Sequence, residues 1–115
     1  MKRQISRIES ETGLTLPANS RLDHFFEREV FVDPIWVAKV LIPESSYENF
    51  KQALLTKPTD KTDYTGALAD STSWWKPINV ILKKQYWADS HHFLVNVVVS
   101  KEDGGFAVYI ECACF

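Results

Sequence analysis

Residues 91–115 read HHFLVNVVVSKEDGGFAVYIECACF, and this stretch decides the fold. Two apolar runs, 91–99 and 106–115, flank the polar segment 101–105, whose glycines Gly104 and Gly105 can take the positive φ angles of a tight turn. Alternate residues of the second run share one face of a strand: Phe106, Val108, Ile110, Cys112 and Cys114. The pattern predicts a hairpin of two antiparallel strands.

Three further segments upstream have the composition of strands. Residues 79–87 and 21–32 alternate along their length, whereas residues 35–42 are apolar at nearly every position. A strand that is apolar on both faces is usually a central strand, covered on both sides. We therefore expect residues 35–42 to lie inside the sheet.

Two helices are predicted from apolar spacing and end signals. Residues 2–12 place Ile5 and Ile8 on one face, and Gly13 can end this helix because glycine readily adopts the left-handed conformation. Ser45 and Glu48 have the spacing of a capping box at the start of a helix that extends to Leu55. Within it, one stripe at helical spacing carries Tyr47, Phe50 and Leu54.

Length and composition indicate one domain that spans residues 1–115. The chain has 115 residues, of which 45% are hydrophobic and 24% are charged, as in an ordinary globular domain. Strands that are joined by short turns pair antiparallel. The expected fold is therefore α+β, a single antiparallel sheet of four to five strands with helices packed on one face.

Charge and hydropathy exclude several classes of partner. The net charge is −2, with 13 basic and 15 acidic residues, so we expect no nucleic-acid binding. No apolar run approaches the roughly 20 residues of a membrane-spanning helix, and the polar start Met1-Lys2-Arg3-Gln4 is not that of a signal peptide. The two cysteines, 112 and 114, lie at the edge of disulfide geometry for one strand, which favours thiols in a reducing, cytoplasmic compartment.

Signatures of catalysis are missing from the sequence. There is no Gly-x-Ser-x-Gly motif, and Gly104-Gly105 precedes a strand rather than the helix of a phosphate-binding loop. His91 and His92 are adjacent, so in a strand they point to opposite faces and cannot easily share an ion. A zinc site formed by Cys112, Cys114 and His92 is one alternative, and burial of both cysteines as small hydrophobic residues is the other. We expect no catalytic residues, no cofactor and no metal.

The strand over residues 21–32 offers the best candidate surface for a protein partner. Strict alternation would place five residues on one face: Asp23, Phe25, Glu27, Glu29 and Phe31. Exposed aromatic rings among carboxylates would suit a basic protein partner, and the long polar segment 56–73 would add Asp60, Asp63 and Tyr64. A helix that covered this face would exclude the surface.

The segment Trp74-Trp75-Lys76-Pro77 supports an alternative function. The two tryptophans either close the end of the core or bound a pocket together with Tyr86 and His92. Such a pocket would make the chain a small-molecule-binding domain or an enzyme. The edge strands of so small a sheet also allow a homodimer through strand pairing.

Three short motifs resemble those of small, uncharacterised bacterial proteins that carry a Trp-Trp-x-Pro motif. They are Thr12-Gly13-Leu14-Thr15-Leu16-Pro17, Trp36-Val37-Ala38-Lys39-Val40, and Trp74-Trp75-Lys76-Pro77 before the apolar C-terminal hairpin. In size and character the chain also resembles bacterial immunity proteins, which bind and neutralise a cognate toxin. The first resemblance implies the same order of elements. The second implies a non-enzymatic, protein-binding function of the immunity or antitoxin type.

Overall fold

The computed structural model describes residues 2–28, 34–59, 72–90, 92–102 and 104–114 of the chain. Within these ranges lie two α-helices and five strands. The helices are α1 (Lys2–Thr12) and α2 (Tyr47–Leu55), and a 3-10 turn (Glu44–Ser46) leads into α2. The strands are β1 (Arg21–Arg28), β2 (Ile35–Pro43), β3 (Val80–Ala88), β4 (Phe93–Glu102) and β5 (Gly105–Cys114).

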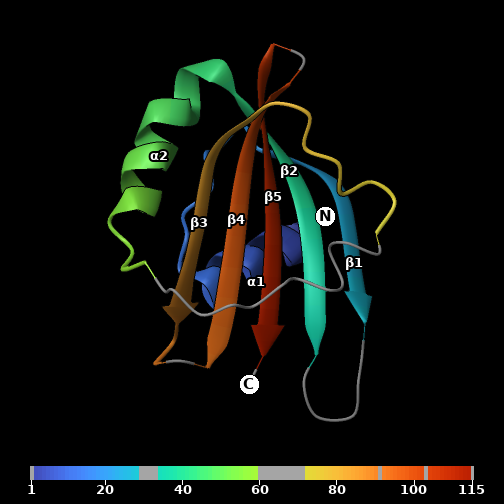
Figure 1. Cartoon of the computed structure of the whole chain (residues 1–115), viewed down its shortest axis with the longest axis vertical. Coiled ribbons are helices and arrows are strands. Elements are labelled where there is room, and N and C mark those ends of the chain that lie inside the picture. Colours follow the sequence, from blue (N-terminus) through green and yellow to red (C-terminus); the bar gives the residue numbers. More distant parts are fainter. Residues whose placement is uncertain (1, 29–33, 60–71, 91, 103, 115) are drawn as a thin grey trace.

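The strands form one antiparallel sheet in the order β1-β2-β5-β4-β3 (Figure 1). β5 is therefore the central strand, and β1 and β3 are the two edges. Pairing of Glu102 with Gly105 closes the predicted hairpin between β4 and β5, and Gly104 has the expected positive φ of 76°. These observations confirm the α+β fold with one antiparallel sheet. β2 is also internal, between β1 and β5, as its continuous apolar sequence predicted.

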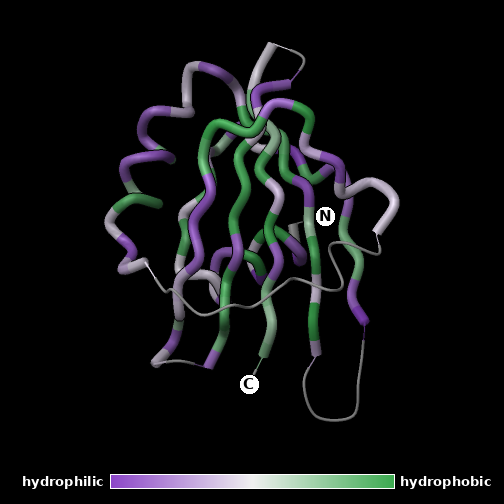
Figure 2. The backbone as a smooth tube through the Cα atoms, in the orientation of Figure 1, coloured by the Kyte–Doolittle hydropathy of each residue, from purple (hydrophilic) through white to green (hydrophobic). Residues whose placement is uncertain are grey.

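One face of the sheet, which we call the helix face, carries the main hydrophobic core. Both helices contribute to this core; α1 lies behind the sheet in the view of Figure 1. The predicted stripe of α2 is buried in it, and alternate residues of the three inner strands supply the rest: Trp36, Ala38, Val40, Ile42, Val95, Val97, Val99, Phe106, Val108, Ile110 and Cys112. Figure 2 shows the hydrophobic residues concentrated along these inner strands.

Polar contacts fix α1 on three different strands. Each contact joins a residue in the middle or at the C-terminal end of α1 to a side chain of the sheet. They are the ion pair of Arg7 with Glu27 of β1, the bond from Trp36 Nε1 of β2 to Glu11 Oε1 at 2.9 Å, and the bond from Tyr86 Oη of β3 to the Thr12 carbonyl at 2.7 Å. Because the partners lie on β1, β2 and β3, the helix is held across the width of the sheet.

The opposite face, which we call the second face, is partly covered by the segment that precedes β3. Trp74 and Trp75 pack there on Ile35 and Val37 of β2, and the Val37 side chain is fully buried. The tryptophans therefore do close a hydrophobic cluster, but the cluster lies on the side of the sheet away from both helices. Residues 72–79 approach β3 across the top of the view in Figure 1.

The two predicted helix-end signals have different outcomes. Gly13 ends α1 as expected, with φ of 72° and a hydrogen bond from its N–H to the Glu9 carbonyl at 3.0 Å. The capping box that Ser45 was predicted to form is wrong. Ser45 lies inside the 3-10 turn, α2 begins two residues later, and the N-cap residue Ser46 makes no capping bond through its side chain. The tight turn after Pro43 delays the first α-helical residue.

Candidate functional site

A β-bulge in β1 determines which side chains reach the second face. Leu22 pairs with Val40 and His24 pairs with the adjacent residue, Lys39, so Asp23 is an extra residue that has no partner in the ladder. A bulge of this kind resets the alternation of side chains along the strand. As a result Asp23 and His24 both lie on the second face, where the carboxylate of Asp23 comes within 3.7 Å of Lys39 Nζ.

The predicted acidic and aromatic face of β1 is wrong because this bulge divides it. Phe25 and Glu27 belong to the helix face, where α1 covers them. The Phe25 ring stacks on Trp36 at a centroid distance of 5.5 Å and lies 5.9 Å from the Arg7 guanidinium. Glu27 accepts two bonds from Arg7, which hold the pKa of its carboxyl below the ordinary value.

The other residues of that predicted surface do not join Phe25 and Glu27 in the described part of the chain. Asp23 lies on the second face, apart from Phe25 and Glu27. The others lie outside the described residues: Glu29, Phe31, Asp60, Asp63 and Tyr64.

The exposed side of β1 is basic and aromatic instead. We call it the β1 strip, and it consists of Arg21, His24, Phe26 and Arg28, whose partners in β2 lie on the second face. Phe26 is 46% exposed, and the His24 ring stacks on Trp74 at 4.9 Å. Neither Arg21 nor Arg28 forms an ion pair with another described residue. Within the part of the chain that the structure describes, the strip therefore presents two guanidinium groups without an ion-pair partner, one on either side of an exposed aromatic ring.

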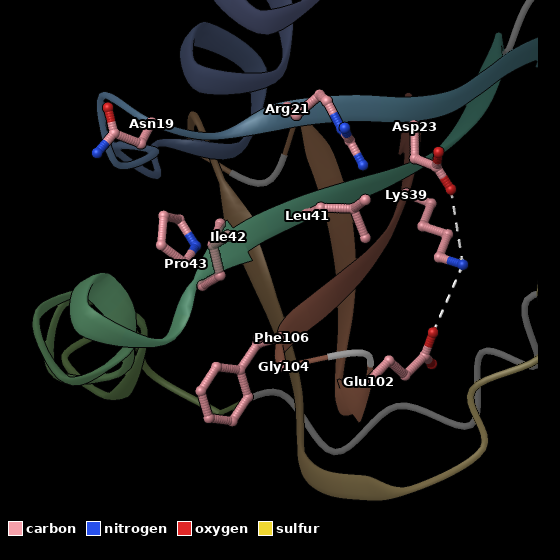
Figure 3. A pocket seen from close by; sticks show the side chains of 11 residues that line it. Asn19, Arg21, Asp23, Lys39, Leu41, Ile42, Pro43, Glu102, Gly104 and Phe106 are labelled. Atoms are coloured by element: carbon pink, nitrogen blue, oxygen red, sulfur yellow. Dashed lines mark ion pairs between the residues drawn. The ribbon is translucent and has the colours of Figure 1, made fainter.

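A charged cluster lies beside the strip, where β1, β2 and the end of β4 meet. Lys39 Nζ stands between Asp23 Oδ2 at 3.7 Å and Glu102 Oε1 at 3.5 Å, as the dashed lines in Figure 3 show. The Tyr109 hydroxyl donates to Glu102 Oε2 at 3.0 Å, and Lys39 Nζ lies 5.3 Å from the centre of the Tyr109 ring. We call Asp23, Lys39, Glu102 and Tyr109 the Lys39 cluster.

Mutual attraction outweighs burial in this cluster. Burial by itself would lower the pKa of Lys39, but Tyr109, Glu102 and Asp23 together hold it above its ordinary value. Burial would likewise raise the pKa of Glu102, whereas bonds from Ser100 and Tyr109 and the charge of Lys39 leave it below its ordinary value. Lys39 is therefore a neutralised cation that positions two carboxylates and does not offer a proton at neutral pH.

A cleft of about 510 Å³ opens between this cluster and the start of β1 (Figure 3). Polar groups line one side, and apolar groups line the other. The lining residues include Arg21, Asp23, Lys39, Glu102, Pro43 and Phe106. Of the two cations in the lining, Lys39 is ion-paired, whereas Arg21 forms no ion pair with a described carboxylate. The cleft and the β1 strip share Arg21, so the two features form one continuous surface.

The predicted pocket bounded by two tryptophans, Tyr86 and His92 is wrong. Trp75 packs its ring edge-on against Tyr109 on the second face at 5.3 Å. Tyr86 lies on the helix face, where its side chain is only 1% exposed and burial raises the pKa of its hydroxyl. His92 lies beside Cys114, at the end of the sheet where β4 begins and β5 ends. The four side chains of the predicted pocket therefore do not surround a common space.

Of the two alternatives for the cysteines, burial of both as hydrophobic side chains is true of only one. Cys112 is buried on the helix face, which raises the pKa of its thiol far above the ordinary value. Cys114 is half-buried, and its Sγ lies 3.5 Å from His92 Nε2. Over the described residues, no three histidine, cysteine or acidic side chains converge as a metal site would require.

The β1 strip was not predicted from the sequence, although one signal pointed to it. Leu22 and Phe25 are apolar residues three positions apart, whereas strict alternation would separate them by two or four. An interval of three in a strand indicates an extra residue between them.

Comparison with known proteins supplies no family for this chain. No family model, no curated protein and no solved structure matches it. Neither helix within the described ranges has the length and apolar character that crossing a membrane requires.

Proposed function

We propose that this chain is a non-enzymatic protein-binding domain whose partner lies along the open edge of β1. The observation that carries the proposal is the exposed Phe26 ring between Arg21 and Arg28. Arginine and aromatic side chains dominate the binding energy of many protein interfaces. Among the described strands β1 pairs with β2 alone, and such an edge offers backbone N–H and C=O groups to a partner strand.

The chemistry of the strip specifies an acidic partner. Two guanidinium groups face solvent there, while the nearby carboxylates of Asp23 and Glu102 both point to the ammonium of Lys39. An extended segment with alternating acidic and apolar side chains would match this pattern, because residues two apart in a strand lie on the same face. Its carboxylates would meet the arginines, and its apolar side chains would contact Phe26. The sequence alone had suggested the reverse, a basic partner.

A finer assignment rests on resemblance rather than on the surface. We propose that the chain is of the immunity or antitoxin type and neutralises a bacterial toxin in the cytoplasm. Its support is the likeness in size and character to immunity proteins and the presence of two cysteine thiols without a disulfide. An acidic strand or loop of the toxin would be the segment that the β1 strip receives.

The test compares two double charge reversals on opposite edges of the sheet. The binding probe is the purified product of the gene that is co-transcribed with this one, and the measurement is titration calorimetry. We expect Arg21→Glu with Arg28→Glu to weaken binding by roughly 10-fold or more, because two attractive contacts become repulsive. The matched control is Lys83→Glu with Lys84→Glu on β3, which should leave the affinity unchanged.

Phe26→Ala tests whether the aromatic ring contributes to binding separately from the charges of the two arginines. The side chain is already 46% exposed, so its removal should cost little stability. As an interface anchor its loss should weaken binding by roughly 30-fold. If the arginine and Phe26 variants bind as tightly as the β3 control, the β1 strip is not the binding surface. If the co-transcribed product does not bind the unaltered chain at all, the toxin assignment fails.

A second candidate function follows from the cleft next to Lys39. A cleft of about 510 Å³ that is lined by both a guanidinium and carboxylates suits a small zwitterion such as an amino acid. Thermal stabilisation by a panel of free amino acids would support this function, provided that Arg21→Met abolishes the effect. The absence of stabilisation at millimolar concentration would leave protein binding as the better account.

A further inference from the structure

We propose that Cys114 is a modification site that reacts with low-molecular-weight disulfides, activated by His92. The basis is the contact between Cys114 Sγ and His92 Nε2, 3.5 Å apart at the exposed lower end of the sheet. A thiol beside an imidazole can transfer its proton to the ring, and the resulting thiolate is the nucleophilic form. Cys114 is half-buried, so its side chain is only partly shielded from solvent.

The fold holds His92 in place for this role. Phe93 of β4 pairs directly with Cys114 of β5, and the preceding residue, His92, places its Nε2 3.5 Å from the sulfur. The imidazole packs at a centroid distance of 4.5 Å against the Phe93 ring, with the two planes nearly perpendicular. The backbone N–H of His92 donates to the Asp89 carbonyl at 3.0 Å. Both the ring and the backbone of His92 are therefore constrained next to the thiol.

Cys112 provides an internal contrast on the same strand and the same face. Burial makes its thiolate unfavourable, and the nearby carboxylate of Glu11 adds to that effect. The two cysteines have Cα atoms about 6.5–7 Å apart, which disfavours a disulfide between them. A mixed disulfide formed at Cys114 would therefore not be resolved by Cys112 and would persist until an external thiol reduced it.

The reaction is a thiol–disulfide exchange, in which Cys114 is oxidised and the small disulfide is reduced by the same amount. Cys114 gives its proton to His92, and the thiolate attacks one sulfur of a disulfide such as glutathione disulfide. A bond forms between Sγ and that sulfur as the original sulfur–sulfur bond breaks. The second half of the disulfide leaves as a thiolate, which can take up the proton from the His92 imidazolium. Each exchange consumes one disulfide and releases one thiol.

The first experiment needs no variant. The folded full chain is incubated with glutathione disulfide at neutral pH, and the adducts are located by peptide mass spectrometry. We expect one glutathione on Cys114 and none on Cys112. In denaturant both cysteines should react at the same ordinary rate, and Cys114 should react roughly 10-fold more slowly than in the folded chain. A folded-state rate at Cys114 that does not exceed the denatured rate would overturn the proposal.

The second experiment isolates the contribution of His92. His92→Gln keeps a polar side chain but cannot form an imidazolium, and the exposed position should tolerate the change. We expect this variant to lose the roughly 10-fold acceleration at Cys114 while Cys112 stays unreactive. Cys114→Ser should abolish the adduct. An unchanged rate in His92→Gln, or an adduct on Cys112 in the folded chain, would contradict the assignment.

Discussion

Arg7 of α1 and Glu27 of β1 form a two-point ion pair that ties the first helix to the edge strand. Arg7 Nη1 donates to Glu27 Oε1 at 2.8 Å, and Arg7 Nη2 bonds the other carboxylate oxygen. Arg7 Nε also donates to Glu11 one helical turn away, at 2.8 Å. This contact explains why the acidic side of β1 is closed to a partner. It also neutralises a carboxylate that sequence alone had placed in solvent.

The Arg7–Glu27 pair should make the free energy of unfolding depend on pH. Arg7 lowers the pKa of Glu27 in the folded chain, so folding is favoured most where Glu27 is ionised. The contribution is fully present above the ordinary value of 4.5 and is lost as the pH falls through the lower folded-state pKa. We expect Glu27→Gln to cost about 1 kcal/mol at neutral pH and almost nothing in strong acid. Urea denaturation across the acid range measures this difference. Glu44→Gln, which changes an exposed carboxylate, should follow the wild-type curve.

The two adjacent glycines of the β4–β5 hairpin should respond differently to alanine. Gly104 has φ of 76° but open space around it, so Gly104→Ala should cost about 1 kcal/mol for the left-handed backbone alone. A Cβ at Gly105 would lie 2.8 Å from the Ile42 carbonyl oxygen of β2, and the backbone there would have to move. We expect Gly105→Ala to cost about 2–3 kcal/mol. Equal losses in urea denaturation would contradict this contrast.

The turn between β3 and β4 contains strain that a substitution can relieve. Asp89 and Ser90 both have φ of 52°, a conformation that glycine adopts more readily than serine does. Ser90→Gly should therefore raise the free energy of unfolding by about 0.5–1 kcal/mol. The matched control is Ser10→Gly in α1, which should lower it by a similar amount because glycine disfavours helix. Thermal unfolding that shifts both variants in the same direction would be inconsistent with the left-handed turn.

Lys39 should be more important for stability than the exposed lysines of the sheet. Its side chain is 17% exposed and lies between two carboxylates, one of which, in Glu102, is only 9% exposed. Lys39→Met would leave Asp23 and Glu102 without their shared cation, at an expected cost of about 1–3 kcal/mol. Lys83→Met on the exposed part of β3 should change stability by less than about 0.5 kcal/mol. Chemical denaturation of the two variants gives the comparison directly.

Much of the fold was predictable because its signals are local. Gly104 and Gly105 between two apolar runs predicted the C-terminal hairpin, and Gly13 predicted the end of α1. The continuous apolar residues of β2 predicted an internal strand. In each case the property depends on neighbours within a few residues. The capping box at Ser45 failed because the tight turn after Pro43 competes with the helix start.

The candidate site was less predictable because it depends on contacts between distant segments. His24 meets Trp74, and Lys39 meets Glu102, across separations that no local pattern encodes. His92 and Cys114 were considered together in the sequence only as metal ligands. The register of β4 against β5 places them as a pair without a third ligand among the described residues.

By itself the sequence determined the α+β class, the hairpin of β4 and β5, and the internal position of β2, because hydrophobic periodicity and glycine conformations are properties of short segments. Only the tertiary structure decided which side of β1 faces solvent. Asp23 is an extra residue in the ladder, and whether a strand takes up such a residue as a bulge depends on its pairing with β2. That one residue turned Glu27 toward Arg7 and left Arg21, Phe26 and Arg28 on the open surface.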